Sequence, residues 1–242
     1  MQIIALFGPT GVGKTGIAVA LAAQLTARGE ESPVAVSADA LQVYEGLEIL
    51  TGVAAPSERA SLEHRLVSCV PLDATFSAGQ YAKLAHAEID GLLAAGRRPI
   101  VVGGTGLYLR AALGELDFER PPPGAPSQLW SEDMRRPTLL AGLTMEREAL
   151  YARIDARVDA MLAAGAREEV RRAHAAGASQ TARKALGFEE LLAGDVEAMK
   201  RHTRNYARRQ LTWMRKLARV RTIDVTGRDP DAVAGEILDS AA

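Results

Sequence analysis

Short apolar runs alternate along the chain with longer stretches of helical periodicity. A run of four or five apolar residues between helical stretches is typical of a strand that is buried on both faces of a parallel sheet. The pattern therefore predicts an α/β fold, with one parallel sheet covered by helices on both faces. The predicted strands are Ile3–Phe7, Val34–Ser37, Leu66–Val70, Ile100–Val102 and Leu139–Leu143, followed by a last short strand, Thr222–Val225.

The remaining stretches predict helices. Gly16–Ala27 and Gln80–Ala95 are rich in alanine, and Gly96 is a stop signal for the second of them. Beyond Thr144 the pattern is helical almost throughout, which predicts a C-terminal helical region. Its helices are expected over Met145–Ala164, Ala166–Ala176, Ala182–Leu192 and a long segment from Val196 to Val220.

Residues 117–137 break this rhythm. Pro121, Pro122, Pro123, Gly124 and Pro126 lie close together there, and a proline cannot sit inside a helix or a central strand. We interpret the segment as a Pro-rich connector or lid. The chain has 242 residues, 48% of them apolar, which is enough to bury one substantial core. We therefore predict a single domain over residues 1–242.

Composition narrows the setting in which the chain works. Cys69 is the only cysteine, so one chain can build neither a disulfide nor a cysteine-based zinc site. No apolar segment is long enough to span a membrane, and the apolar first residues run directly into a glycine motif, unlike a signal peptide. These features favour a cytoplasmic protein, and we predict no membrane association and no stable protein partner.

A glycine-rich loop carries the most specific chemical signal. Residues 8–15 match the pattern G-x-x-x-x-G-K-S/T between a predicted strand and a predicted helix, the setting of a phosphate-binding P-loop. The backbone amides, the helix N-terminus and the Lys14 ammonium would hold a di- or triphosphate, and the Thr15 hydroxyl can ligate Mg²⁺. The alternative is a glycine turn without a ligand. The candidate diphosphate-binding residues are Gly8, Thr10, Gly11, Gly13, Lys14 and Thr15.

Two further polar residues follow predicted strands. Asp39 comes just after Val34–Ser37, at the edge where open α/β sheets bind their ligands, and is a candidate general base or a magnesium ligand through water. A helix N-cap is an equally open interpretation of Asp39. Thr105 follows Gly103 and Gly104 and is placed to bond a phosphate oxygen or a substrate base. Backbone geometry alone would also explain this glycine pair.

The predicted long helix is strongly cationic. Between Met199 and Thr222 there is no acidic residue, and every charged residue in this segment is Lys or Arg. Such a stripe predicts a phosphate-rich partner, because a merely solvated helix normally mixes charges of both signs. At helical spacing, one face holds Arg201, Arg204, Arg208, Arg215 and Arg219, and the opposite face holds Tyr206, Gln210, Trp213 and Leu217.

Together these stretches resemble the tRNA dimethylallyltransferases, which prenylate the adenosine immediately 3′ of the anticodon. Residues 8–15 resemble the diphosphate-binding loop of that family, and residues 37–44 and 99–109 resemble its second and third motifs. The most specific match is residues 203–213, TRNYARRQLTW. Residues 151–170 and 185–190 also resemble family segments.

The resemblance implies a P-loop transferase that moves a dimethylallyl group from dimethylallyl diphosphate to the N6 amine of a tRNA adenosine. Asp39 would be the general base, Thr105 would line the reaction channel, and Arg204 with Lys14, Thr15 and Mg²⁺ would hold the leaving diphosphate. The resemblance also places Gln42, Tyr44, Arg201, Arg208, Arg209 and Gln210 in the binding of the substrate or the tRNA.

The chain departs from the family in two places. Residues 50–56 lack the basic residue that the family usually carries after its second motif. The short connector 117–137 stands in place of the helical insertion with which the family grips the anticodon arm. An enzyme that prenylates a free adenine nucleotide is therefore an alternative, as are a P-loop kinase of a small molecule and a non-catalytic nucleotide- or RNA-binding protein.

Overall fold

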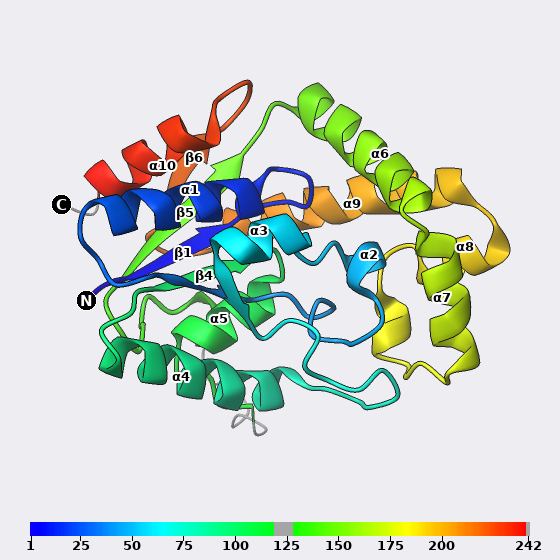
Figure 1. Ribbon diagram of the computed structural model, residues 1–242, viewed down its shortest axis with the longest axis horizontal. Coiled ribbons are helices and arrows are strands. Elements are labelled where there is room, and N and C mark those ends of the chain that lie inside the picture. The colour runs from blue at the N-terminus through cyan, green and yellow to red at the C-terminus, as the bar shows by residue number, and fades with distance from the viewer. Residues whose placement is uncertain (119–127, 241–242) are drawn as a thin grey trace.

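The structure, a computed structural model, describes residues 1–118 and 128–240. Its strands form one six-stranded sheet in the order β3-β2-β4-β1-β5-β6, and each paired neighbour is parallel (Figure 1). The parallel α/β fold is thus confirmed. The strands are β1 (Ile3–Phe7), β2 (Val34–Ser37), β3 (Glu63–Arg65), β4 (Pro99–Gly103), β5 (Thr138–Thr144) and β6 (Arg221–Asp224).

Helices cover both faces of the sheet and extend beyond its carboxyl edge. Those before β5 are α1 (Lys14–Ala27), α2 (Glu48–Thr51), α3 (Pro56–Ser61), α4 (Ala78–Ala94) and α5 (Gly106–Leu113), with a 3-10 turn, η1, at Gln128–Trp130. Those after β5 are α6 (Arg147–Ala163), α7 (Ala166–Ala175), η2 (Ala182–Lys184), α8 (Phe188–Ala193), α9 (Val196–Met214) and α10 (Pro230–Asp239).

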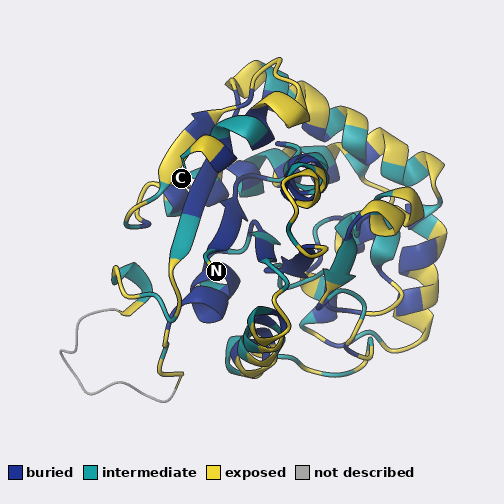
Figure 2. Ribbon diagram, turned by 60° about the vertical axis from the view of Figure 1, so that its left-hand side comes forward, coloured by how far each residue is buried: buried dark blue, intermediate teal, exposed yellow. Residues whose placement is uncertain are grey.

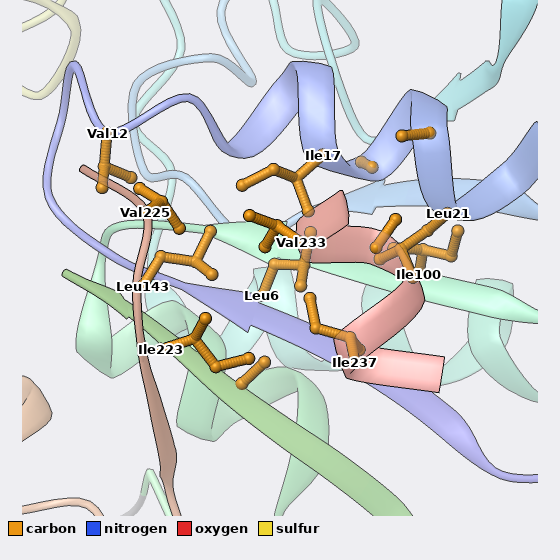
Figure 3. Close-up of a cluster of buried hydrophobic side chains, with 14 of the residues drawn as sticks. Leu6, Val12, Ile17, Leu21, Ile100, Leu143, Ile223, Val225, Val233 and Ile237 are labelled. Carbon is orange, nitrogen blue, oxygen red and sulfur yellow. The ribbon is translucent and has the colours of Figure 1, made fainter. Parts of the chain in front are cut away.

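Alternate residues of β1 point to opposite faces of the sheet and enter two separate cores. Ile4 and Leu6 belong to a core under α1 and α10, whereas Ile3 and Phe7 belong to a core under α4 and α5. Figure 2 shows the central strands as buried. Figure 3 shows the first core, in which side chains from the sheet meet those of α1 and α10: Leu6, Ile100, Leu143, Ile223, Ile17, Leu21, Val233 and Ile237.

The C-terminal helices form a third core beyond the end of the sheet. Val158 of α6, Val170 of α7 and Phe188 at the start of α8 pack there against Tyr44 and Leu47 from the segment after β2. In Figure 1, α9 runs from α8 back toward the sheet. This arrangement places α6 and α9 beside the carboxyl ends of β1, β2 and β4, where the candidate site residues lie.

Local backbone geometry corrects three sequence-based boundaries. The predicted strand Leu66–Val70 was wrong: β3 lies just before it, and left-handed φ angles of 58° at Leu66 and 43° at Ser68 end the extended backbone. The predicted helix Ala182–Leu192 is divided into η2 and α8, because Gly187 adopts a φ of 95°.

The third correction concerns the long cationic helix, which ends at Met214 and not at Val220. Turns follow it, and Arg219 has a left-handed φ of 54°. The helix α10, which the sequence analysis did not predict, follows β6 and begins with Asp229 as its N-cap and Pro230 as its first residue. Residues 119–127 of the predicted connector lie outside the described residues, and its last part begins with η1. No helix of the described residues is long and apolar enough to cross a bilayer.

Candidate active site

A cavity of about 950 Å³ opens at the carboxyl edge of the sheet. The P-loop, the start of α1, the segment after β2 and the end of β4 line it, together with side chains of α6 and α9. This edge is where the strand order turns from one side of β1 to the other, the place at which open α/β sheets bind ligands. Among the predicted site residues, Thr10, Gly11, Gly13, Lys14, Thr15, Asp39, Gln42 and Gln210 line the cavity.

The P-loop has the geometry of an anion cradle. Gly11 and Gly13 adopt left-handed φ angles of 82° and 100°, which only glycine tolerates without strain. Gly13 is also the N-cap of α1 and offers no side chain to the first amides of the helix. These amides, together with the positive end of the helix dipole, are therefore available to an anion in the cavity.

Lys14 is folded back onto its own loop. Its Nζ donates hydrogen bonds of 2.9 Å to the backbone carbonyls of both Gly8 and Pro9. Burial lowers the pKa of Lys14 to about 8, an effect that Asp39 partly opposes and the guanidinium of Arg157 reinforces. The ammonium is thus held in an environment that is short of negative charge, and a bound anion would favour its charged form.

Asp39 lies in a turn after β2 and not at the start of a helix. Its Oδ1 accepts a 3.0 Å hydrogen bond from the Leu41 amide, and the next helix, α2, begins only at Glu48. The helix N-cap interpretation therefore does not apply. Asp39 forms no ion pair with any described residue and lines the cavity, so its carboxylate is accessible to a substrate.

Thr105 links the two loops that follow β2 and β4. Its Oγ1 accepts a hydrogen bond of 3.3 Å from the Ala40 amide, next to Asp39, and lies 3.4 Å from the Tyr206 hydroxyl of α9. Burial, with a contribution from Asp39, raises the pKa of Tyr206 to about 12, so this hydroxyl stays protonated at neutral pH. Asp39 and Tyr206 line the cavity, and Thr105, which is not among its lining residues, links the turn beside Asp39 to Tyr206.

Two glycines at the end of β4 permit a close approach of neighbouring segments. A Cβ at Gly103 would overlap the backbone of Ala38, and one at Gly104 would overlap the side-chain amide of Gln210. Gln210 is only 4% exposed, and its side-chain amide links the P-loop to the loop after β4. Its Oε1 accepts from the Thr10 amide at 2.9 Å, and its Nε2 donates to the Gly104 carbonyl at 2.8 Å.

The predicted substrate-binding residues after β2 occupy different environments. Gln42 lines the cavity and accepts a bond from the Ser37 hydroxyl, while its Nε2 donates to the carbonyls of Thr51 and Gly52. Tyr44 is 1% exposed, and its hydroxyl donates to Thr181 Oγ1 at 2.7 Å. In this conformation Gln42 can meet a ligand, whereas Tyr44 packs in the third core.

The cations of α9 divide into free and engaged groups. Arg201, Arg208 and Arg209 are exposed, as the cationic stripe predicts for a phosphate-binding face. Arg204, in contrast, does not line the cavity: its Nη1 lies 2.6 Å and 2.7 Å from the two carboxylate oxygens of Asp155 on α6. The structure therefore does not bring Arg204 together with Lys14 and Thr15.

Sequence reasoning passed over two arginines that do line the cavity. Arg153 and Arg157 lie one helical turn apart on α6 and face the P-loop region. The spacing of four residues in Arg153-Ile154-Asp155-Ala156-Arg157 was the available signal, because it puts both side chains on one helical face. The sequence alone did not show that this face of α6 would lie opposite the P-loop.

A P-loop at the switch point of a parallel sheet, with a free carboxylate on the next strand, defines an enzyme of the P-loop class that acts on a phosphorylated substrate. Comparison with known proteins narrows this class to one family. The IPP transferase family model matches residues 42–136 and 124–217, and the chain belongs to this family.

Relatives and solved structures agree with this family. A tRNA dimethylallyltransferase of Thermobifida fusca is 34% identical, with 90% of this chain and 88% of the relative covered, and one of Geobacillus thermodenitrificans is 32% identical, with 98% and 94% covered. The crystal structure of a tRNA isopentenylpyrophosphate transferase from Bacillus halodurans superposes with a TM-score of 0.86 at 28% identity, covering 99% of this chain and 95% of that one.

The aligned relatives contain residues that have no counterpart in this chain. The alignment with the Thermobifida protein runs over 282 residues although it takes in 90% of this 242-residue chain, so the relative carries residues that this chain lacks. The family model likewise matches in two pieces that overlap at residues 124–136, within the predicted connector. The shortened connector over residues 117–137 stays a prediction.

Proposed function

We propose that this protein transfers a dimethylallyl group from dimethylallyl diphosphate to the N6 amine of the adenosine 3′ of the anticodon in tRNA. The tRNA-prenylating relatives support this activity and do not favour a kinase or an enzyme of free nucleotides. The observation that carries the proposal is that the P-loop and the free carboxylate of Asp39 line one cavity. With tRNA as its substrate, the enzyme would work in the cytoplasm.

We assign each part of the reaction to a group that lines the cavity. The diphosphate of the donor would lie on the amides of residues 11–15, and the allylic C–O bond breaks with its electron pair leaving on the diphosphate. The N6 nitrogen forms the new C–N bond, and its proton passes to the Asp39 carboxylate. Negative charge that develops on the diphosphate is stabilised by fixed donors and by the buried Lys14 ammonium.

Thr105 and Tyr206 would position the base and keep Asp39 in place. The Thr105 hydroxyl accepts a hydrogen bond from the Ala40 amide and thereby holds the turn that carries the Asp39 carboxylate. The protonated hydroxyl of Tyr206 remains a hydrogen-bond donor beside the same site. Because the target base is stacked in the anticodon loop, it must be extruded to reach this cavity.

Mg²⁺ fits the donor set as a companion of the substrate diphosphate. The described residues contain no group of three or more His, Cys, Asp or Glu side chains that would cage a metal. Mg²⁺ in phosphate-transfer sites is usually held by one or two protein oxygens together with phosphate oxygens and water. The Thr15 hydroxyl would supply the protein oxygen, with Asp39 available through water, and the ion would neutralise part of the diphosphate charge.

A transfer assay tests the proposal. Purified protein receives radiolabelled dimethylallyl diphosphate with unmodified tRNA, AMP or ATP in parallel, and label is expected in tRNA. Label that enters only AMP would overturn the choice of acceptor, and ATP turnover without transfer would show a kinase.

Asp39→Asn tests the base while it keeps the Oδ1 acceptor for the Leu41 amide. We expect turnover to fall by about 10²-fold or more, the usual contribution of a general base, with donor binding retained. Asp73→Asn, at an exposed aspartate outside the cavity, is the matched control. Near-normal turnover of Asp39→Asn would show that Asp39 is not the base.

A further inference from the structure

The short helix α2 forms part of the cavity wall but lacks a cap of its own. Residues 48–56, which comprise α2 and the segment after it, all line the cavity. Leu47 occupies the N-cap position, and its apolar side chain gives the helix no hydrogen bond. Since α2 is only four residues long, its internal hydrogen bonds are too few to hold it, and its first amides need an acceptor from elsewhere.

Glu169 of α7 supplies that acceptor from a position 120 residues beyond Ile49. Its Oε1 accepts a hydrogen bond of 2.8 Å from the Ile49 amide, and its Oε2 accepts one of 2.7 Å from the Leu50 amide. These are the second and third amides of α2, the two that an N-cap side chain takes in an ordinary helix. The two helices lie side by side in Figure 1, so α7 caps α2 across the fold.

The Glu169 carboxylate is buried where it makes these bonds. The residue is 4% exposed, and no other acidic residue among those described is as deeply buried. Burial raises the pKa of Glu169, and the amides of Ile49 and Leu50 oppose this rise. The Glu48 carboxylate adds to the rise, whereas the Arg172 guanidinium opposes it. A buried carboxylate is costly unless hydrogen bonds satisfy it, so the two bonds to α2 are what makes this burial tolerable.

The other end of α2 is held by a residue of the site itself. Gln42 lines the cavity and donates from Nε2 to the carbonyls of Thr51 and Gly52. Between the two ends, Leu50 is buried in the third core. Glu169 therefore fixes the end of α2 that Gln42 does not reach, and the wall depends on side-chain hydrogen bonds at both ends.

We propose that Glu169 is a positioning residue of the transferase, which caps α2 and thereby holds residues 48–56 where they complete the substrate cavity. The proposal rests on the function proposed above. Glu169 does not line the cavity, so it acts through α2 and not by touching the donor or the acceptor. Without the cap, α2 samples other conformations, and a ligand binds only the fraction of molecules in which the wall is in place. The apparent affinity falls by that fraction.

Two variants remove the cap to different extents. Glu169→Ala leaves both amides of α2 without an acceptor, whereas Glu169→Gln keeps one oxygen and turns an N–H group toward the other amide. Ser179→Ala is the matched control, because Ser179 is also buried and its Oγ accepts a hydrogen bond from the Ala182 amide of the short turn η2. The residues of η2 do not line the cavity, so the control weakens a comparable contact away from the wall.

Amide hydrogen exchange of the full chain without ligand, followed by mass spectrometry, tests the cap. Peptides that span residues 47–56 should exchange about tenfold faster or more in Glu169→Ala, since they lose two hydrogen bonds. The increase should be smaller in Glu169→Gln and absent in Ser179→Ala. Unchanged exchange in these peptides for both Glu169 variants would overturn the proposal.

Donor binding and kinetics then separate positioning from a purely structural role. If the wall is in place in about one molecule in ten, calorimetry with dimethylallyl diphosphate in the absence of tRNA should show about tenfold weaker binding to Glu169→Ala. The KM for the donor should rise by a similar factor, with kcat at saturating donor within about threefold of wild type. Ser179→Ala should keep the wild-type KM although it melts at a lower temperature, as the Glu169 variants also should.

The possible failures are distinguishable. A wild-type KM in both Glu169 variants, with only kcat reduced, would show loss of folded enzyme and would overturn the positioning role alone. If wild type binds the donor but transfers it to no tRNA, the proposed function fails, and the exchange and binding measurements still decide the role of Glu169. If wild type does not bind the donor, both proposals fail. Should Glu169→Ala not fold, Glu169→Gln carries the same comparison.

Discussion

Gln210 joins the P-loop to the loop after β4, and its replacement by methionine isolates that link. The substitution keeps the length and approximate volume of the side chain but removes both of its hydrogen bonds. The Thr10 amide loses its acceptor and the Gly104 carbonyl loses its donor, each at a distance below 3 Å in the native protein. Because Gln210 is 4% exposed, water reaches these groups poorly after the exchange.

The magnitude follows from the two orphaned groups. A buried polar group without a partner costs about 1–3 kcal/mol, and Gly104 is buried whereas Thr10 is half-buried, so the combined cost is about 2–4 kcal/mol. For a chain of this size, 1 kcal/mol corresponds to about 2–4 °C in melting temperature. We therefore expect Gln210→Met to melt roughly 4–15 °C below wild type.

Thermal unfolding followed by circular dichroism measures this shift. Gln24→Met is the matched control, because Gln24 donates one exposed hydrogen bond, to the Asp231 carbonyl, and should cost under about 1 kcal/mol. We also expect the KM for the prenyl donor to rise in Gln210→Met, since the P-loop loses a contact that holds its binding conformation. A melting temperature within about 2 °C of wild type would refute the bridging role of Gln210.

Three further predictions concern charge and close packing. Burial lowers the pKa of Lys14 to about 8, so the free protein loses this charge as the pH rises through 8. Donor affinity measured by calorimetry should fall by up to about tenfold per pH unit above 8, and Lys14→Met should show a flat profile. Gly103→Ala, whose Cβ would meet neighbouring backbone, should lower the melting temperature and activity. Gly91→Ala, in the last turn of α4 where a Cβ would meet open space, should stabilise the protein by up to about 1 kcal/mol. In filter-binding assays against salt concentration, Arg201→Gln should lower the slope for tRNA binding by about 1, and Arg147→Gln should leave it unchanged.

Much of the fold was predictable because it depends on local patterns. The strands β1, β2, β4 and β5 are short apolar runs, and their burial on both faces follows directly from that composition. The P-loop was recognisable because its function depends on consecutive backbone amides, which a contiguous motif specifies. The place of Asp39 just after β2 was predictable for the same reason, whereas the choice between a turn and a helix N-cap needed the structure.

Features that depend on positive φ angles at ordinary residues were not predictable. Leu66 and Ser68 adopt left-handed conformations that their side chains disfavour, and tertiary packing must impose these. An apolar run therefore looked like a strand where the chain turns. The end of α9 at Met214 was missed for a similar reason. The next six residues have a composition that is compatible with a helix, so the sequence alone gives no stop signal there.

The role of each arginine depends on its partner and not on its helical face. Periodicity correctly groups Arg201, Arg204 and Arg208 on one side of α9, but Asp155 of α6 neutralises the second of them. The acid that neutralises it lies between Arg153 and Arg157 in the sequence, and those two remain free beside the P-loop. The exposed cations of α9 thus remain candidates for RNA binding, whereas the unpaired cations of α6 line the cavity beside the P-loop. Only the packing of α6 against α9 separates these two sites.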